Sequence, residues 1–355
     1  MSIRAVELYR YPADLKKPYH TSFGDLAFFD SVIAVIRTDE GVGAGESTAV
    51  PGYSWESPQD VWQFAVSHAP LLIGMSADEA RSLLNPLVPK APFGVTPLLS
   101  AVEEAAVPPS LHGELALAGI LNVTEIREIP REVENLLAQG FHTIKFKIGF
   151  DVESDVRKTK LIQQCLKGRA LLRLDANQHY TLDEARHFAR AVSPEGIELL
   201  EQPFGSHDWD TMLRFSPESP LPLMLDESIY GPDDIRRAID SRCAAFIKLK
   251  LCKAGSMENL CDQGRLVSSG GMKLVIGNGV ATDIACRQEL AASVRLAASG
   301  IAVAAGEMNG FLKLVNQTTE SSPIFRNGNI MLNSGCPLPD TAELQAKATD
   351  WQIFR

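Results

Sequence analysis

The feature that most restricts the fold is a pattern that recurs from about residue 113 onward. A short apolar stretch ends in a polar residue, and a helix-like stretch follows before the next apolar stretch. Residues 181–192 are typical of the helical part, with one apolar stripe and acids near the start. Such alternation favours parallel strands joined by crossovers. The pattern predicts strands within residues 114–119, 143–149, 170–177, 197–203, 222–228, 244–251, 273–279 and 301–308.

The polar residues at the ends of five consecutive predicted strands have nearly constant spacing. Successive members are 28, 26, 25 and 24 residues apart, in the order Lys147, Asp175, Glu201, Asp226 and Lys250. One strand, one helix and two loops take about that many residues, since eight such units make a barrel of roughly 200–250 residues. A doubly wound open sheet is the competing fold, but no GxGxxG phosphate loop follows the first strand. We therefore predict an α/β barrel whose chemistry lies at the carboxyl ends of its strands.

Residues 1–112 follow a different pattern, and a chain of 355 residues is too long for one ordinary core. Residues 3–12 and 30–47 have the composition of antiparallel strands. Two later segments each begin with serine followed by acids, which is typical of helix starts, at 57–74 and 76–88. We predict an α+β capping domain at 1–112, to which a tail from about 336 to 355 returns, and a barrel at 113–335.

Composition narrows the classes of partner. The net charge is −10 and no cluster of Lys or Arg occurs, which argues against nucleic acid. No stretch approaches the roughly 18–20 apolar residues of a membrane span, and the N-terminus lacks an apolar run of the signal-peptide type. The six cysteines show no metal or disulfide spacing, which favours reduced thiols in a cytoplasmic protein. We expect a homo-oligomer that acts on a small-molecule carboxylate.

Three acids, Asp175, Glu201 and Asp226, end three consecutive predicted strands. Neighbouring strands lie about 4.8 Å apart, so the three carboxylates would converge and repel one another unless a cation joined them. Oxygen donors without a nearby His or Cys favour Mg²⁺ over zinc or copper. In the alternative interpretation, each acid caps a following helix or pairs with an arginine at the rim of the barrel.

Two pairs of lysines flank the acid strands. Lys145 and Lys147 share one face of the strand before the three acids, while Lys248 and Lys250 share one face of the strand after them. A lysine beside another cation is pushed toward its neutral form, which can act as a general base. Alternatively, the lysines form structural ion pairs with the acids, above all Lys145 and Lys248, which lie one pleat deeper.

This arrangement suits removal of the α-proton of a carboxylate. A substrate carboxylate on Mg²⁺ would give a metal-stabilised enolate when its α-proton leaves. One lysine would take the proton from one face. The other lysine would return a proton to the opposite face, or stabilise the anion while a β-group departs.

With these motifs the chain resembles the enolase superfamily and, within it, the muconate lactonizing enzyme subgroup. The resemblance covers nearly the whole chain and rests on GVGAGES at 41–47, KFK at 145–147, LDANQ at 174–178, EQPF at 201–204, LDES at 225–228 and KLCKAG at 250–255. It implies a capping domain on a modified TIM barrel, (β/α)₇β. The mandelate racemase branch is excluded, because its histidine base is absent from the seventh strand, VIGNGVATD.

The resemblance also implies roles for individual residues. Mg²⁺ would lie on the three strand-end acids, with Lys147 and Lys250 as the acid/base pair. Lys145 would help to polarise the substrate carboxylate. Groups behind the ligands and bases would be Asn177, Glu227 and Lys248.

Specificity in this subgroup comes from the eighth strand and the capping loops. Dipeptide epimerases resemble this chain but carry Asp-x-Asp-Gly on the eighth strand for the substrate ammonium, where this chain has Glu307 and Asn309. The Glu307 carboxylate could still pair with an ammonium group; alternatively, it caps a helix or pairs with Lys313. Capping residues that could touch substrate, although core or surface roles fit them equally, are His20, Phe23, Tyr53 and Trp55.

We expect racemisation or epimerisation of an amino-acid derivative or dipeptide, because both lysines are present and Glu307 offers an ammonium partner. The alternative reaction is β-elimination or cycloisomerisation, like that of o-succinylbenzoate synthases or muconate cycloisomerases. A protein of a different class, a barrel that binds metal and ligand without turnover, is opposed by the complete set of lysines and acids.

Overall fold

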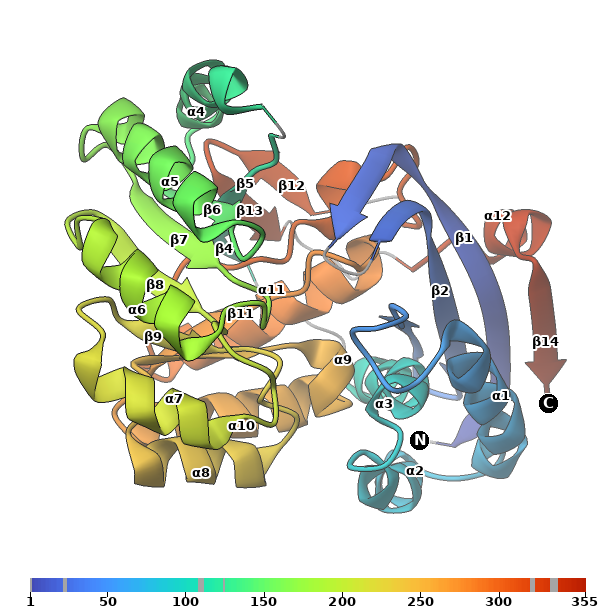
Figure 1. Cartoon of the computed structure of the whole chain (residues 1–355). Coiled ribbons are helices and arrows are strands. Elements are labelled where there is room, and N and C mark those ends of the chain that lie inside the picture. The colour runs from blue at the N-terminus through green and yellow to red at the C-terminus, as the bar shows by residue number, and fades with distance from the viewer. Residues whose placement is uncertain (1, 22–23, 108–111, 124, 320–322, 333–337) are drawn as a thin grey trace.

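The computed structural model describes residues 2–21, 24–107, 112–123, 125–319, 323–332 and 338–355 (Figure 1). Its centre is a parallel sheet in the order β11-β10-β9-β8-β7-β6-β5. The strands are β5 (Ala118–Leu121), β6 (Thr143–Lys147), β7 (Leu171–Asp175), β8 (Ile197–Glu201), β9 (Leu223–Leu225), β10 (Phe246–Leu249) and β11 (Lys273–Ile276).

Helices alternate with these strands and cover the outer face of the sheet (Figure 1). Residues 182–191 show why: Thr181 caps the helix, and Ala185, Phe188 and Ala189 are buried along one stripe. The predicted alternation of strand and helix is therefore confirmed. The helices are α4 (Ile129–Ala138), α5 (Val152–Leu166), α6 (Leu182–Ala191), α7 (Trp209–Phe215), α8 (Pro232–Ser241), α9 (Leu251–Ala254), α10 (Met257–Ser269) and α11 (Asp283–Ala298).

The segment 301–308, predicted as an eighth strand, does not form a regular strand. It contacts both edges of the seven-stranded sheet through single bridges, at Leu274–Val303 and Leu117–Gly306. The backbone N–H of Gly306 donates to the Ala116 carbonyl at 2.7 Å. The barrel is thus closed by isolated hydrogen bonds rather than by a continuous ladder. The fold is a modified TIM barrel with a capping domain, as predicted.

The prediction of the first barrel strand, 114–119, was wrong in the extent of the strand. The structure divides this stretch between β5 and β4 (Gly113–Ala116), and β4 belongs to a different sheet. That sheet is antiparallel, with the order β12-β13-β4, and its other strands are β12 (Ile324–Arg326) and β13 (Asn329–Leu332). The period of the apolar residues cannot reveal such a break, because it does not say which sheet a strand joins.

A buried apolar cluster fills the barrel beneath the polar strand ends. Leu199 lies two residues before Glu201, so both side chains are on the inner face of β8. The same spacing relates Met224 to Asp226. The cluster forms a dry floor under the site, and its members are Leu199, Met224, Phe246 and Val275.

The capping domain is built on an antiparallel sheet in the order β14-β1-β2-β3. Ser57 and Ser76 begin its first two helices as predicted, each in a reciprocal capping box. Its elements are β1 (Ile3–Thr21), β2 (Gly24–Thr38), β3 (Val42–Thr48), β14 (Asp350–Phe354), α1 (Pro58–His68), α2 (Ala77–Leu84), α3 (Pro92–Ala106) and α12 (Thr341–Lys347).

The C-terminal strand β14 pairs with residues 6–10 of β1, so distant parts of the sequence share this sheet. The domain boundaries themselves stay a prediction. Five of the six cysteines lie in the described part of the chain, and all five are free thiols.

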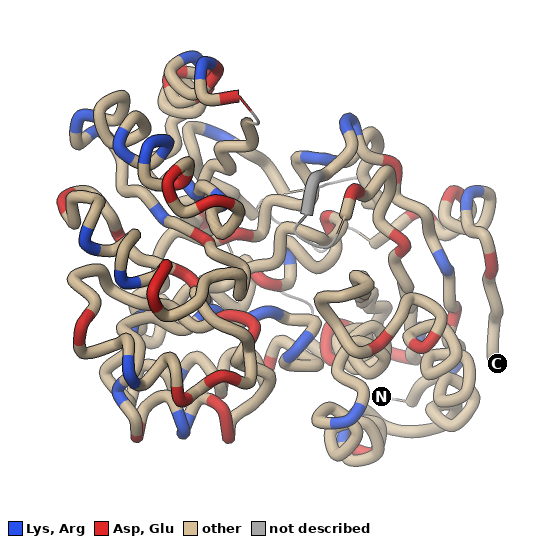
Figure 2. The backbone as a smooth tube through the Cα atoms, in the orientation of Figure 1, with Lys and Arg blue, Asp and Glu red and all other residues tan. Residues whose placement is uncertain are grey.

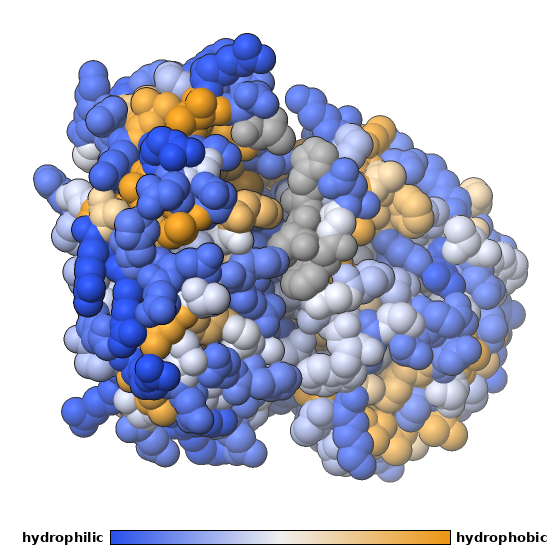
Figure 3. Space-filling model, in the orientation of Figure 1, coloured by the Kyte–Doolittle hydropathy of each residue, from blue (hydrophilic) through white to orange (hydrophobic). Residues whose placement is uncertain are grey.

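The surface carries the mixture of acidic and basic residues that the composition of the sequence leads one to expect (Figure 2). Lys and Arg alternate with Asp and Glu over the chain in the view of Figure 2. The same face is mainly hydrophilic, with hydrophobic residues in separate groups (Figure 3). Among the described residues, no helix combines the length and the apolar composition that crossing a membrane would require.

Candidate active site

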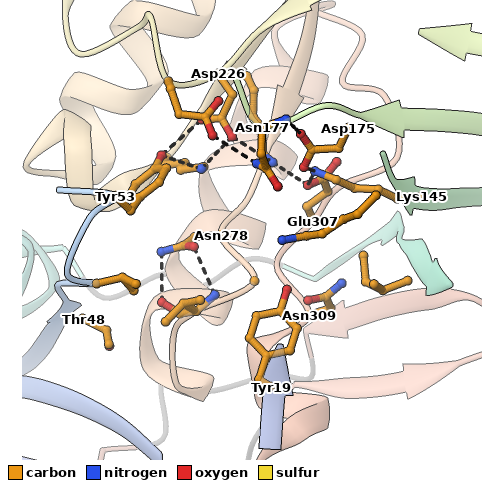
Figure 4. A pocket seen from close by; sticks show the side chains of 18 of the residues that line it. Tyr19, Thr48, Tyr53, Lys145, Asp175, Asn177, Asp226, Asn278, Glu307 and Asn309 are labelled. Atoms are coloured by element: carbon orange, nitrogen blue, oxygen red, sulfur yellow. Dashed lines mark hydrogen bonds and ion pairs between the residues drawn. The ribbon is translucent and has the colours of Figure 1, made fainter. Parts of the chain in front are cut away.

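A cavity of about 780 Å³, including its open mouth, lies at the carboxyl ends of the barrel strands (Figure 4). Segments of the capping domain form part of its wall, which brings the two domains together at one site. The capping residues are Tyr19, Thr48, Val50, Tyr53 and Phe93. The barrel residues include Lys145, Lys147, Asp175, Asp226, Lys248, Lys250, Glu307 and Asn309.

The three strand-end acids lie on neighbouring strands in register. Asp175 of β7 pairs with Glu201 of β8, and Glu201 pairs with Met224 of β9, two residues before Asp226. All three carboxylates are buried. They therefore meet at one end of the barrel, above the apolar floor.

Two ammonium groups hold these carboxylates. Lys145 Nζ lies 2.9 Å from Asp175 Oδ2 and 2.6 Å from Glu201 Oε2. Lys248 Nζ lies 3.1 Å from Glu201 Oε1 and 3.3 Å from Asp226 Oδ2. Burial alone would lower the pKa of both lysines, but the surrounding carboxylates raise it above its ordinary value, so both are cations. For these two deeper lysines, the ion-pair alternative describes their contacts.

Lys147 and Lys250 are placed differently. Lys147 lines the cavity without an ion pair to any described residue, and burial lowers its pKa although Asp175 opposes the shift. Lys250 donates to the Tyr53 hydroxyl at 2.6 Å and to Asp226 Oδ2 at 2.7 Å. In sheet order, the three acid strands separate β6, which carries Lys147, from β10, which Lys250 directly follows. The two amino groups thus approach the cavity from different sides.

Glu307 contacts three cations. Its Oε2 lies 2.9 Å from Lys145 Nζ and 2.5 Å from Lys248 Nζ, and its Oε1 lies 3.4 Å from Arg173 Nη1. Burial alone would raise the pKa of Glu307, but these cations hold it well below its ordinary value. A substrate ammonium would have to compete with three internal partners for this carboxylate.

Lys313, the alternative partner predicted for Glu307, has other contacts. Its ammonium donates to Asn309 Oδ1 at 2.9 Å and to the carbonyl of Gly279. It also lies 4.1 Å from the centre of the Tyr19 ring. Asn309 is therefore held at the cavity wall by Lys313.

Asn177 and Glu227 meet next to the acids, where the resemblance places supporting groups. Asn177 Nδ2 donates to Glu227 Oε1 at 3.1 Å, and its backbone N–H donates to Asp175 Oδ1 at 3.0 Å. Asn177 has a φ of 41°, in the left-handed region that asparagine tolerates better than most residues. Burial raises the pKa of Glu227 to about 7.

Sequence reasoning missed two residues that position the loop after β9. Gln202 Oε1 accepts from the backbone N–H groups of Asp226, at 3.0 Å, and Ser228, at 3.2 Å. Lys253 Nζ donates to the carbonyls of Asp226, at 2.9 Å, and Ile229, at 3.1 Å. Their positions in the sequence could have pointed to both residues, because Gln202 lies inside the EQPF motif and Lys253 inside the KLCKAG motif.

The capping residues that were predicted to touch substrate differ in where the structure places them. Tyr53 reaches the site through Lys250 and also donates to Asp226 Oδ1 at 3.2 Å. Trp55 is 56% exposed and its ring packs 4.3 Å from that of Tyr230. Phe23 and the side chain of His20 lie outside the described residues.

The strand-end acids are the donor set that fits Mg²⁺. Among the described residues, the structure contains no group of three Asp, Glu, His or Cys side chains that is arranged to hold a metal ion. The three strand-end acids do not form such a group because the ammonium groups of Lys145 and Lys248 lie between their carboxylates. The donor chemistry still fits, since all three donors are carboxylates on adjacent strands. A further buried acceptor, Glu227 Oε2, has no hydrogen-bond partner within the described part of the chain.

Comparisons with known proteins agree with this geometry. A family model described as Enolase C-terminal domain-like matches residues 128–337, which is more than half of the chain. N-succinyl-L-Arg/Lys racemase of Bacillus cereus is 24% identical over 336 residues, 88% of each chain. L-Ala-D/L-Glu epimerase of Bacillus subtilis is 28% identical over 309 residues, 80% of this chain and 82% of the relative.

Solved structures share the fold. N-succinyl Arg/Lys racemase from Bacillus cereus superposes with a TM-score of 0.91 over 100% of both chains, at 21% identity. Muconate lactonizing enzyme from Pseudomonas fluorescens gives a TM-score of 0.88 over 98% of this chain and 99% of that one, at 23% identity. The family match and the strand-end motifs lead to one conclusion: the chain belongs to the enolase superfamily, among the isomerases and lyases of its muconate lactonizing enzyme subgroup.

Proposed function

We propose that this enzyme removes and returns the α-proton of a carboxylate substrate, and so racemises or epimerises an amino-acid derivative or dipeptide. One observation carries the proposal: Lys147 and Lys250 line one cavity from strands on either side of the three acids. Two amino groups facing a bound α-carbon from different sides suit proton exchange at both of its faces. The racemase and epimerase among the relatives support the same reaction class.

The two lysines differ in their surroundings. Lys147 has its pKa lowered by burial and lacks an ion pair among the described residues, so its Nζ suits the acceptor of the α-proton. Lys250 is held by Tyr53 and Asp226, so its ammonium suits delivery of a proton from the other side. For the opposite enantiomer the two roles exchange.

Asp175, Glu201 and Asp226 would hold Mg²⁺. When bound, the ion supplies positive charge beside the substrate carboxylate, which lowers the cost of negative charge developing there. Lys145 and Lys248 shift away from the acids in this proposal, and Lys145 then turns to the substrate carboxylate. Gln202 and Lys253 keep the Asp226 backbone in place throughout.

A second reaction, β-elimination or cycloisomerisation, uses the same groups with one lysine as base. The firm attachment of Lys250 favours it, because an ammonium fixed by Tyr53 and Asp226 can stabilise an anion without giving up a proton. The fold shared with a muconate lactonizing enzyme is compatible with it.

Isotope exchange in heavy water tests the proposal. Each enantiomer of a series of N-acylamino acids and dipeptides is incubated with Mg²⁺, and α-deuterium is followed by NMR. Both epimers should gain deuterium, whereas an eliminase would give an unsaturated product. Lys147→Ala and Lys250→Ala should each slow exchange at least about 100-fold. The Mg²⁺ affinity of Lys147→Ala, measured by calorimetry, should be nearly unchanged, because this lysine has no ion pair to a described metal-site acid.

Lys347→Ala serves as the control, because this lysine pairs with Glu343 on the surface of α12, away from the cavity. It should exchange at the wild-type rate. Wild-type exchange in both Lys147→Ala and Lys250→Ala would refute the acid/base assignment.

A further inference from the structure

Glu289 of α11 lies behind the wall of the active-site cavity. It lines a smaller cavity of about 210 Å³, including its open part, which shares Thr48, Asn278 and Val280 with the larger one. The residue is only 1% exposed. Burying a carboxylate is costly unless its oxygens have partners, so the contacts of Glu289 indicate its role.

Both oxygens of Glu289 accept backbone N–H groups that follow two neighbouring strands. Oε1 accepts from Leu251 at 3.1 Å, and Oε2 accepts from Asn278 at 3.0 Å. Leu251 directly follows Lys250 at the end of β10, and Asn278 lies two residues beyond the end of β11. The two strands are parallel neighbours in the barrel sheet. One carboxylate thus ties both strand ends together beside Lys250.

The N–H of Leu251 needs such a partner because it begins a helix. α9 starts at Leu251, and Lys250 before it has an extended backbone and makes no side-chain hydrogen bond to the helix. The first N–H groups of a helix have no partner within it, and a lysine side chain carries no acceptor. The carbonyl of Lys250 accepts from Lys253 and Ala254, at 3.1 and 3.0 Å. The Lys250 backbone is therefore fixed by α9 on one side and by Glu289 on the other.

The charge of Glu289 also acts on Lys250. Burial raises the pKa of Glu289 to about 7, and the charge of Glu46 acts in the same direction. The two N–H donors and the nearby charge of Lys250 oppose this shift. Because the attraction between two charges is mutual, the Glu289 carboxylate attracts the Lys250 ammonium from behind the cavity wall, while Asp226 contacts it directly.

The second partner connects Glu289 to the wall of the active-site cavity. The Asn278 side chain accepts from the Val280 N–H and donates to the Val280 carbonyl, each at 3.0 Å (Figure 4). Asn278 Nδ2 also lies 3.6 Å from the Cys252 sulfur of α9. The loop after β11 and α9 are therefore held together, and Glu289 anchors both to α11.

We propose, on the basis of the proposed function, that Glu289 is a positioning residue for Lys250. Its carboxylate fixes the backbone that carries the Lys250 side chain, so that the ammonium meets the substrate α-carbon at the distance that proton transfer requires. Lys147 lies outside this arrangement, because β9, β8 and β7 separate its strand from β10. Glu289 thus sets the rate of proton exchange at one face of the substrate and not at the other.

Glu289→Gln tests the proposal with little change in side-chain volume. One of its two oxygens becomes an NH₂ group, which cannot accept a hydrogen bond, so one backbone N–H loses its partner. The probe is the compound that the wild type exchanges fastest among the N-acylamino acids and dipeptides, as separate enantiomers. At about pH 8, where wild-type Glu289 is ionised, exchange at the Lys250 face should fall about 10-fold, the effect of one hydrogen bond to a charged group. Exchange at the Lys147 face should change less than about twofold.

Glu46→Gln is the matched control. Glu46 lines the same small cavity, is also 1% exposed, and accepts from the backbone N–H groups of Thr282, at 2.7 Å, and Ala285, at 3.2 Å. Burial raises its pKa to about 7, as for Glu289. Its partners lie at the start of α11 and not beside Lys250, so this variant should keep the wild-type ratio of the two exchange rates. An equal change of the ratio in both variants would overturn the proposal.

A second measurement follows the Lys250 side chain without turnover. The enzyme is labelled with ¹³Cε-lysine, and the NMR signals of Lys250 and Lys147 are assigned by their absence from Lys250→Ala and Lys147→Ala. Glu289→Gln should move the Lys250 signal and leave the Lys147 signal in place, whereas Glu46→Gln should move neither.

The two measurements distinguish this inference from the proposed function. If the wild type exchanges none of the compounds while Glu289→Gln moves the Lys250 signal, the proposed function is contradicted and the link between Glu289 and Lys250 stands. An unmoved Lys250 signal, or an unaltered ratio of rates in an enzyme that does exchange, would overturn this inference.

Discussion

The ammonium of Lys248 lies 2.5 Å from Oε2 of Glu307, although the two residues are 59 positions apart in the chain. Both side chains are buried, and Lys145 contacts the same Glu307 oxygen. This contact links β10 to the segment 301–308, whose backbone pairs with the sheet only through single bridges in the described part of the chain. The pair therefore helps to close the barrel as well as to set the charge of the site.

Replacing Glu307 by Gln should destabilise the fold. Breaking a buried ion pair by removing one partner costs about 3–5 kcal/mol, because the remaining charges lose their compensation. Lys145, Lys248 and Arg173 would all lose a negative partner. Urea unfolding should show a lower midpoint with an unchanged slope. Glu343→Gln, which removes an exposed partner of Lys347, is the control and should unfold like the wild type.

Replacing Lys248 by Met should tighten Mg²⁺ binding. Its ammonium contacts Glu201 and Asp226, two of the acids assigned to the ion. Unit charges 4 Å apart interact by about 4 kcal/mol at an effective dielectric constant of 20, so removing this competing cation should lower Kd at least about tenfold. Calorimetry with Mg²⁺ alone measures the change. An unchanged or higher Kd would mean that Lys248 does not compete with the ion.

Tyr53→Phe should slow exchange at one face of the α-carbon. The variant removes the hydroxyl that Lys250 contacts at 2.6 Å and leaves the ring, which lies 4.3 Å from the ammonium. We expect the rate at the Lys250 face to fall about tenfold, the effect of one hydrogen bond to a charged group. The rate at the Lys147 face should stay the same. Deuterium exchange of separate enantiomers gives both rates.

Tyr180→Phe is the matched control for Tyr53→Phe. Its buried hydroxyl donates to Asp155 Oδ2 at 2.9 Å, and it does not line the cavity. Loss of this hydroxyl should leave the ratio of the two exchange rates unaltered. Equal slowing at both faces by Tyr53→Phe would contradict a specific link between Tyr53 and Lys250.

Stability should depend on the protonation of Glu46. Burial raises the pKa of Glu46 to about 7, from about 4.3 in an unfolded chain. The folded state thus binds this proton more tightly, so its contribution to stability is largest at low pH and is lost as pH rises from about 4.3 to 7. Glu46→Gln cannot titrate, and its free energy of unfolding should fall less between pH 5 and pH 7.5 than that of the wild type. Urea unfolding at both pH values tests this, and equal falls would contradict it.

The strand ends could be predicted because their spacing is local and regular. Lys147, Asp175, Glu201 and Asp226 each occupy a fixed place in a repeating unit, and parallel strands bring such places together. The short segment 301–308 could not be predicted in the same way. Its two bridges depend on the final separation of β11 and residue 117, which only the closed barrel defines.

The ion-pair partners of the charged residues also could not be predicted from the sequence. Glu307 was expected to bind a substrate ammonium or Lys313, whereas it contacts Lys145 and Lys248. Lys145 is 162 positions away in the chain, so no spacing rule relates the two. Sequence patterns place a charge on a face of an element. Which opposite charge it meets depends on how elements from the whole chain pack.

The pairing of β14 with β1 has a consequence for how the molecule is made. Residues 6–10 leave the ribosome first among the sheet strands, yet their outer neighbours, 350–354, are synthesised only after the entire barrel. During translation one edge of β1 therefore stays open, and an open edge is a template for association with another chain. A nascent chain stalled before residue 350 would expose that edge, so cells that slow translation late in this gene should accumulate aggregates seeded by the capping sheet.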